Sequence, residues 1–343
     1  MSGQPTVPGR NIILGFLALA IAWGLFGSLD QKNIPYRGFG WNADAEVTRV
    51  AAGGPAAQAG LQVGDRILSI GGVATDDRSA RQRQPRALIG ETRDLVVERT
   101  DEATGATTTE TLPITYSPQP TSSGTDWLPG LAIGLVFLLC GVTVYLRAPS
   151  RPTLLYCALC LCLGAVMMPG PYLASFALRM VQEVLVMVGF LGGFVLMLHF
   201  LLLFPKRKHF LERPDAWKWV YIPGAGAAAL GIILDFLGPG SGILANILTI
   251  VMGIILLAYM VSSIAAMVHT YVRTTPAERT EFGLTYVLWG VIVALVPIGL
   301  MLVVSMLGGY PPGGEFYYLA LVLIPVAFTV ALLKAGRPTE AVS

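Results

Sequence analysis

Few side chains in this sequence of 343 residues could do acid–base, nucleophilic or metal chemistry. The three histidines, His199, His209 and His269, lie in three different segments. None stands beside a glutamate in the His-Glu-x-x-His spacing that places two imidazoles on one helix turn for zinc. Ser241 could pair with His269 as nucleophile and base, but we expect the two near opposite membrane faces. The residue types therefore predict a protein that is not an enzyme.

The four cysteines lie in apolar runs, at Cys140, Cys157, Cys160 and Cys162. Apolar surroundings argue against a secreted disulfide framework. The offsets of three and two among the last three do not place them all on one face of a helix, and no further ligand accompanies them. We expect buried apolar packing, with no metal and no cofactor.

Ionisable groups inside a bilayer are costly and are candidates for function. Arg179 and Glu183 are four residues apart, where a helical ion pair forms, and Asp235 and Glu315 flank other helix ends. We consider Arg179, Glu183 and His199 as a possible intramembrane polar site. The alternatives are interfacial charges that pair structurally and, for His199, a polar tether between helices rather than a proton relay.

The composition indicates a membrane protein. Only 13% of the residues are charged, against about 25% in an ordinary globular chain, and mean hydropathy is +0.65. The 23 bases and 21 acids nearly cancel, which gives no global charge for binding nucleic acid. A purely soluble protein is excluded.

Eight apolar stretches approach the length of about 20 residues that a transmembrane helix needs. The predicted fold is an all-α polytopic membrane bundle of about eight helices, or six or seven if the short third stretch is re-entrant. The stretches are Ile12–Gly27, Leu128–Leu146, Thr153–Met168, Val181–Phe204, Val220–Leu237, Ile243–Val268, Phe282–Leu307 and Phe316–Leu333.

The loop charges predict the orientation of the chain. Twelve Lys and Arg residues, from Arg10 to Arg337, fall at the ends and in alternate loops, whereas the opposite short loops hold only Arg179. Basic loops stay in the cytoplasm, so both termini are predicted inside and the segment after the first helix outside. Leu25 and Phe26 stand where signal cleavage needs a small residue, which favours an uncleaved first helix.

Residues 30–126 are charged and rich in turns, which predicts a separate extracytoplasmic domain. We expect strands at Ala45–Val50 and Arg66–Ile70, a glycine-capped helical turn at Ala56–Leu61 and a tight turn at Gly71-Gly72. A helix at about 78–89, shortened or kinked by Pro85, and a hairpin of residues 95–100 with 107–113 complete the domain.

The run Gly-Pro-Ala-Ala-Gln-Ala-Gly-Leu-Gln-Val-Gly-Asp-Arg-Ile-Leu-Ser-Ile-Gly-Gly, residues 54–72, resembles the core of bacterial PDZ domains. The resemblance implies an α+β, small barrel-like fold that adds a peptide C-terminus to a sheet edge. By position, Tyr36, Arg37, Gly38, Phe39 and Gly40 resemble the loop that binds the carboxylate, with Phe39 walling an apolar pocket. The alternative is that this segment is a linker strand and the domain a spacer.

Three arginines on the helix expected at 78–89, Arg81, Arg83 and Arg86, are interpreted as solvating its outer face rather than as binding residues.

The membrane half has short sequence motifs at its helix ends, such as His199-Phe200-Leu201-Leu202-Leu203-Phe204-Pro205 and Ile324-Pro325-Val326-Ala327-Phe328. With the PDZ-like domain, these resemble the input regions of bacterial multi-pass sensor histidine kinases and sensor phosphatases. The sequence lacks their phosphoacceptor helix, ATP lid and phosphatase acids, so we expect no catalytic output. The predicted domains are residues 1–29, a transmembrane helix; 30–126, PDZ-like; 127–334, seven transmembrane helices; and 335–343, a cytoplasmic tail.

The resemblance implies a sensor in the bacterial cytoplasmic (inner) membrane, with its PDZ domain in the periplasm or outside the cell. Expected partners are a peptide or protein C-terminus, membrane lipids and another membrane or cytoplasmic protein. Two alternatives stay open at this point: a structural or assembly subunit of a larger membrane complex, and a transporter or lipid-handling protein.

Overall fold

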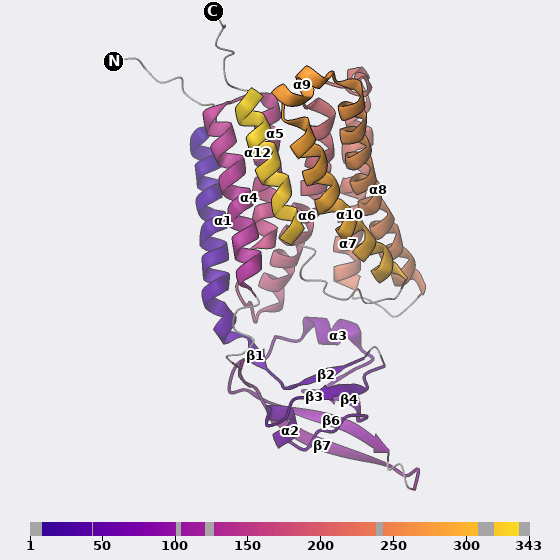
Figure 1. Cartoon of the computed structure of the whole chain (residues 1–343). Helices are drawn as coiled ribbons and strands as arrows, with labels where there is room; N and C mark the ends of the chain where they lie inside the picture. Colours follow the sequence, from indigo (N-terminus) through magenta and orange to yellow (C-terminus); the bar gives the residue numbers. More distant parts are fainter. Residues whose placement is uncertain are drawn as a thin grey trace, which may run out of the picture.

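The computed structural model describes residues 9–42, 44–100, 104–120, 127–237, 243–307 and 319–335. It consists of a bundle of long helices with a smaller body of strands and short helices at one end (Figure 1). The smaller body lies between α1 (Arg10–Asp30) and α4 (Leu128–Arg147), and we call residues 31–120 the insert. α1 begins and α12 (Leu323–Ala335) ends at the bundle end away from the insert (Figure 1).

The bundle is completed by the helices that follow α4 in the chain. They are α5 (Arg151–Met167), α6 (Phe176–Leu203), η3 (His209–Glu212), α7 (Ala216–Leu237), α8 (Ile243–Arg273), α9 (Pro276–Glu281), α10 (Leu284–Met306), η4 (Ala320–Val322) and α12.

In the part of the chain that the structure describes, six helical segments are long and apolar enough to cross a membrane. They are Arg10–Asn33, Leu128–Arg147, Phe176–Leu203, Ala216–Leu234, Asn246–Arg273 and Leu284–Met306. Arg151–Met167 and Ala320–Lys334 are apolar but shorter, so the predicted count of about eight spans is not confirmed.

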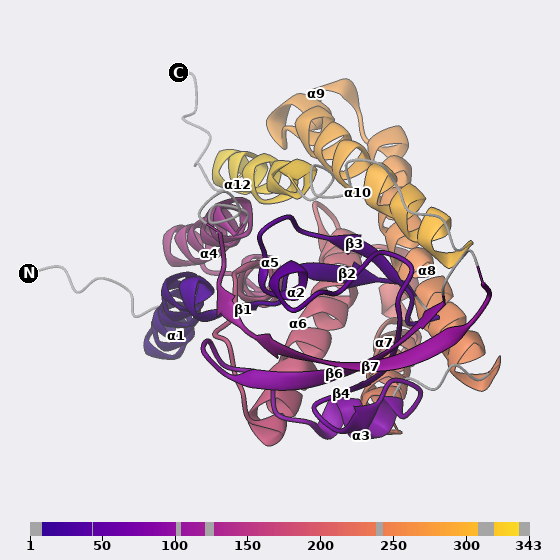
Figure 2. The same cartoon turned by 90° about the horizontal axis from the view of Figure 1, so that it is seen from below.

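Seen along the bundle, the helix α6 lies near its centre (Figure 2), and it packs against α5, α7 and α8. Its Gly193 faces Leu163 of α5 so closely that a Cβ at this glycine would overlap the leucine side chain. Small residues permit such close helix contacts in membranes. Around the Phe200 side chain of α6, Tyr156 and Phe328 pack with ring centroids 5.6 and 5.0 Å away. A buried aromatic core therefore fixes α6 against α5 and α12.

The described part of the insert consists of three antiparallel sheets, two short α-helices and one turn of 3-10 helix, η1 (Gln31–Asn33). The four-stranded sheet has the order β5-β4-β6-β7, and the two smaller sheets are β2-β3 and β1-β8. The strands are β1 (Pro35–Tyr36), β2 (Phe39–Trp41), β3 (Val47–Val50), β4 (Arg66–Ile70), β5 (Val73–Ala74), β6 (Thr92–Thr100), β7 (Thr107–Thr115) and β8 (Ser117–Pro118); the helices are α2 (Pro55–Gln58) and α3 (Arg78–Arg83). Because β1 pairs with β8, the segments that enter and leave the insert lie side by side.

Apolar residues of alternate strand positions make the core of the insert, where Val47, Ile67 and Val97 are almost fully buried. At its edge Asp65 is 2% exposed and accepts two hydrogen bonds of 2.7 Å from the guanidinium of Arg99. The bond with Asp65 raises the pKa of Arg99. This pair ties the turn before β4 to β6.

Most local predictions for the insert are confirmed: β4, the hairpin of β6 with β7, and Gly71-Gly72 with positive φ at both glycines. The helix predicted over about 78–89 is shortened, as Pro85 indicated: α3 ends at Arg83 and Gln84 is extended. The following residue, Pro85, disfavours the helical conformation at Gln84, and its ring cannot continue a helix. The six residues after Arg83 are consequently free to turn toward the bundle.

Candidate functional site

The strand β2 has an open edge. It pairs only with β3 among the described strands, so its other side carries no strand partner. The Ala51 N–H donates to the Gly38 carbonyl at 2.8 Å, and hydrogen-bonded and non-bonded pairs alternate along an antiparallel ladder. The next pair, Phe39 opposite Val50, is therefore non-bonded, and the N–H and C=O of Phe39 point away from β3. An extended chain could bond there.

The loop before β2 needs glycine at Gly38. Its φ is +81°, and a Cβ there would lie 3.1 Å from Cδ of Pro55. The carbonyl oxygens of Arg37 and Gly38 accept hydrogen bonds from Ala56 N–H and Ala51 N–H. The loop is thus folded onto the start of α2, and its carbonyls face away from the open edge.

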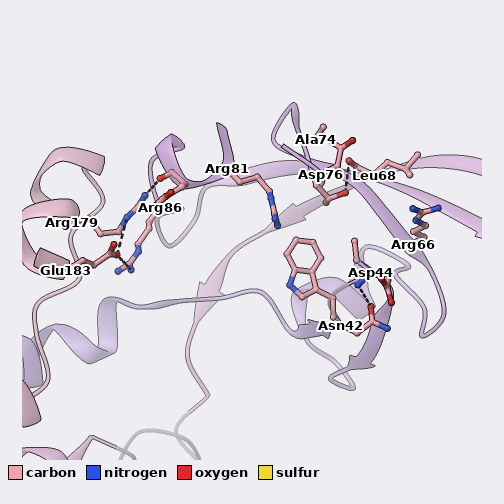
Figure 3. A pocket seen from close by; sticks show the side chains of 14 residues that line it. Asn42, Asp44, Arg66, Leu68, Ala74, Asp76, Arg81, Arg86, Arg179 and Glu183 are labelled. Atoms are coloured by element: carbon pink, nitrogen blue, oxygen red, sulfur yellow. Dashed lines mark hydrogen bonds and ion pairs between the residues drawn. The ribbon is translucent and has the colours of Figure 1, made fainter. Parts of the chain in front are cut away.

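A cavity of about 1110 Å³ runs between the end of β2 and α3, and we call it the groove. Arg81 of α3 lies across it from Trp41 of β2, with its guanidinium carbon 5.6 Å from the indole centroid. The far end is polar: Figure 3 shows Asn42, Asp44, Arg66 and Asp76 there. A second, smaller cavity of about 410 Å³ lies at the Gly38 end of β2, and we call it the loop pocket.

Four arginines line the loop pocket, Arg37, Arg49, Arg86 and Arg93, and no acidic side chain does so among its described lining residues. Arg93 donates to Glu91 Oε1 at 2.6 Å, a bond that lowers the pKa of Glu91. The Arg37 guanidinium stacks 4.7 Å from the Phe39 ring centroid, and burial lowers the pKa of Arg37. The loop pocket is therefore basic.

The bundle helix α6 completes one end of the groove. Arg179 donates to the Gln82 carbonyl of α3, and Glu183 pairs with Arg86 at 3.8 Å and with Arg179 at 3.7 Å (Figure 3). These contacts join residues about 100 positions apart in the sequence. The groove is consequently lined by both parts of the molecule.

The loop between α5 and α6 makes further bonds to the insert. The Arg86 N–H donates to the Ala174 carbonyl at 3.2 Å, and the Tyr172 hydroxyl donates to the Ala87 carbonyl at 2.7 Å. The Tyr172 N–H also donates to Asp30 Oδ2 at 2.6 Å, at the end of α1. The segment that follows α3 is thereby fixed to the bundle.

Residues 46–99 match the family of PDZ domains. The insert contains a PDZ domain. Two relatives, human and mouse Tax1-binding protein 3, are each 34% identical to the chain over 85 residues. This alignment covers 23% of the chain and spans 63% of the length of each relative. No solved structure matches the chain.

The structure brings most of the predicted loop residues together around the loop pocket. Tyr36, Arg37, Gly38 and Phe39 line it, and Gly40 follows in β2. Phe39 also belongs to the core of the PDZ domain and is only 7% exposed, so it offers the pocket little apolar surface. Peptide binding by these five residues stays a prediction.

The interpretation of Arg81 and Arg86 as outer-face residues is wrong, since both line the groove. Only Arg83 is exposed and away from both cavities. The helix ends before Arg86, and the chain there turns onto the bundle, which no local pattern indicates. Sequence reasoning also missed Trp41, whose position two residues after Phe39 in the same strand was an available signal.

The possible polar site of Arg179, Glu183 and His199 is not one site. Arg179 and Glu183 form the predicted ion pair. His199 lies 20 residues further along α6 from Arg179, about 30 Å at 1.5 Å per residue. Its Nδ1 is 2.6 Å from the Tyr221 hydroxyl of α7, as predicted for a tether.

Several other residues considered in the sequence analysis do not form a functional site among the described residues. Ser241 and Glu315, and the side chain of Asp235, lie outside the described residues. Cys157 and Cys160 are buried, whereas Cys140 and Cys162 are half-buried. No group of three His, Cys, Asp or Glu side chains that could hold a metal ion occurs among the residues that the structure describes.

Proposed function

We propose that this protein is a non-enzymatic membrane receptor. Its PDZ domain captures the C-terminus of a peptide or protein outside the cytoplasm, and the bundle relays this to a separate membrane or cytoplasmic partner. The observation that carries the proposal is that the groove beside β2 is lined by both the PDZ domain and α6.

Peptide capture is supported by the open edge of β2. The outward N–H and C=O of Phe39 offer the bonds of an added antiparallel strand, and the loop pocket lies where the end of such a strand would stop. The presence of a PDZ domain and the relatives' name, which describes a binding protein, both favour protein–protein interaction.

The relay is supported by the position of α6. A peptide in the groove would lie beside Arg179 and Glu183, so its binding can change how the first turns of α6 contact α3. The same helix packs against α5, α7 and α8, which gives a shift at its outer end a route to the rest of the bundle. For such a relay the peptide must bind more tightly to one arrangement of α6 against α3 than to another.

The test is a binding measurement on the full chain in nanodiscs, with peptide libraries that end in a free carboxylate or in an amide. We expect binding of free-acid peptides only. In Gly38→Val binding is lost, because the side chain meets Pro55 and requires an unfavourable φ. The matched control is Gly105→Val, where valine would also adopt an unfavourable positive φ, of +67°, but would meet no neighbouring atom.

Two results would contradict the proposal. One is equal binding of the free-acid and amidated libraries, or no binding of either. The other is stable co-purification with a membrane complex that peptides do not alter, which would favour the assembly subunit instead.

A further inference from the structure

The loop pocket holds more positive charge than one peptide carboxylate neutralises. Two of its arginines have acidic partners: Arg93 bonds Glu91, and Arg86 pairs with Glu183. For Arg37 and Arg49 the described contacts include no carboxylate. Two guanidinium groups therefore stand at the end of β2 with formal charges that no carboxylate of the described residues compensates.

The two arginines differ in how they are held. Arg37 is half-buried and stacks over Phe39 and Trp41, at 4.7 and 5.4 Å from the ring centroids. Arg49, in β3 opposite Gly40, is exposed. Arg37 is thus held in position by its stacking, whereas the exposed side chain of Arg49 can move onto a ligand. Bonds between guanidinium and carboxylate are charge-assisted and about twice as strong as neutral ones.

The loop pocket and the groove continue along the same strand. Residues 36–39 and Ala87 line the loop pocket, and Arg86 lines both cavities. The groove is lined by Trp41, Asn42, Asp44, Ala45 and Arg81. A strand added antiparallel to β2 would therefore place its last residue in the loop pocket. The volume of about 410 Å³ is within the range of about 300–1000 Å³ of small-ligand pockets, so a whole side chain fits beside the α-carboxylate.

Resting on the proposed function, we propose that the ligand ends in an acidic residue. The α-carboxylate and the side-chain carboxylate of a terminal Asp or Glu together match the two uncompensated guanidinium groups of Arg37 and Arg49. The Arg37 cation lies over the Phe39 ring and Phe39 itself is buried, which disfavours a large aliphatic terminal residue.

The experiment uses the full chain in neutral phosphatidylcholine nanodiscs. Libraries randomised upstream carry a last residue fixed as Glu, Gln or Val with a free carboxylate, or Glu with an amide. We expect the Glu free-acid library to bind about tenfold more tightly than the Gln library, a preference that falls as salt is raised. In Arg49→Gln the Glu and Gln libraries bind alike, whereas Arg83→Gln, an exposed arginine of α3, keeps the preference.

The outcomes separate the two proposals. Equal binding of the Glu, Gln and Val free-acid libraries would overturn the acidic terminus and leave peptide capture standing. Failure of every free-acid library would overturn both. The last experiment repeats the binding measurement in nanodiscs that contain phosphatidylglycerol. If this lipid lowers peptide binding in the wild type but not in Arg49→Gln, and the Glu library has no preference over Gln, the pocket binds a phosphate headgroup and the inference is wrong.

Discussion

The PDZ domain and the bundle stabilise their buried polar groups in different ways. In the PDZ domain the buried carboxylate of Asp65 is paired with a full charge, on Arg99. In the core of the bundle the bonds are made by neutral hydroxyls: Tyr156 donates to the Pro325 carbonyl at 2.7 Å and Tyr259 to the Val220 carbonyl at 2.6 Å. Charged groups are costly within a membrane, so neutral bonds suit a bundle that we propose to span one.

Charged groups reach the bundle at its ends: Lys208 donates to the buried Thr270 hydroxyl, and Arg179 lies at the contact with the PDZ domain. Arg179 and Glu183 bring charge onto α6 where it meets the PDZ domain, and their partners are Gln82 and Arg86 of that domain. The comparison teaches that charge on this helix serves the contact between the two parts rather than the bundle core. Four variants test this difference between the PDZ domain and the bundle, and they are given from the largest expected effect to the smallest.

Arg99→Ala should destabilise the PDZ domain by roughly 2–4 kcal/mol, because it leaves the carboxylate of Asp65 buried without its partner. Hydrogen exchange of the full chain should show faster exchange in β6 and β7 and unchanged exchange in α6. The control is Arg83→Ala, which removes an exposed arginine. Equal effects of both variants would show that the buried pair is not a main support of the domain.

Tyr156→Phe should destabilise the bundle by about 1–2 kcal/mol, since the Pro325 carbonyl loses its buried donor. The thermal midpoint of the full chain in nanodiscs measures this change. Tyr286→Phe, at a tyrosine that is 66% exposed, serves as the control and should leave the midpoint unchanged. Identical midpoints for Tyr156→Phe and the wild type would argue against neutral hydroxyl bonds as supports of the bundle.

Glu183→Gln should change stability by less than about 1 kcal/mol, because the Glu183 side chain is more than a third exposed and Arg179 keeps its bond to the Gln82 carbonyl. Its main effect should be on coupling: peptide binding then no longer alters hydrogen exchange in α6. Glu98→Gln, in β6 and away from the groove, should retain that response. A response that persists in Glu183→Gln would remove this contact from the relay.

Glu278→Gln should have the smallest effect, seen only in acid. The hydrogen bond from Lys206 lowers the pKa of Glu278 from 4.5 to about 2. A carboxylate with a lowered pKa in the folded state contributes stability above its unfolded pKa, and that contribution disappears as pH falls through the folded pKa. The wild-type thermal midpoint should therefore fall between pH 4.5 and about 2 by more than that of the variant, with Glu281→Gln as the control.

How far the sequence predicts the molecule depends on the range of the interactions involved. The strand Arg66–Ile70, the glycine turn after it and the hairpin follow from local alternation and turn residues, and they are confirmed. The apolar runs predict the bundle helices, but not whether the 17 residues of α5 cross a membrane.

The groove could be predicted only in part. The loop from Tyr36 to Gly40, next to the groove, was predicted from its resemblance to the PDZ carboxylate-binding loop, and its binding role stays a prediction. The contribution of α6 could not be predicted, because Arg179 and the Gln82 carbonyl are 97 positions apart and meet only in the tertiary structure. For the same reason Arg86 was assigned to a helix face, whereas it lies beyond the helix and pairs with Glu183.

The most direct test of the account is photo-crosslinking from α6 to a bound peptide. A crosslinking residue replaces Glu183 in the full chain, and a second protein carries it at Tyr286, on the exposed face of α10. We predict that a labelled free-acid peptide crosslinks at position 183 and that excess unlabelled peptide abolishes the product. Saturable binding of that peptide with no crosslink at position 183, or with equal crosslinking at position 286, would contradict a groove shared by the PDZ domain and the bundle.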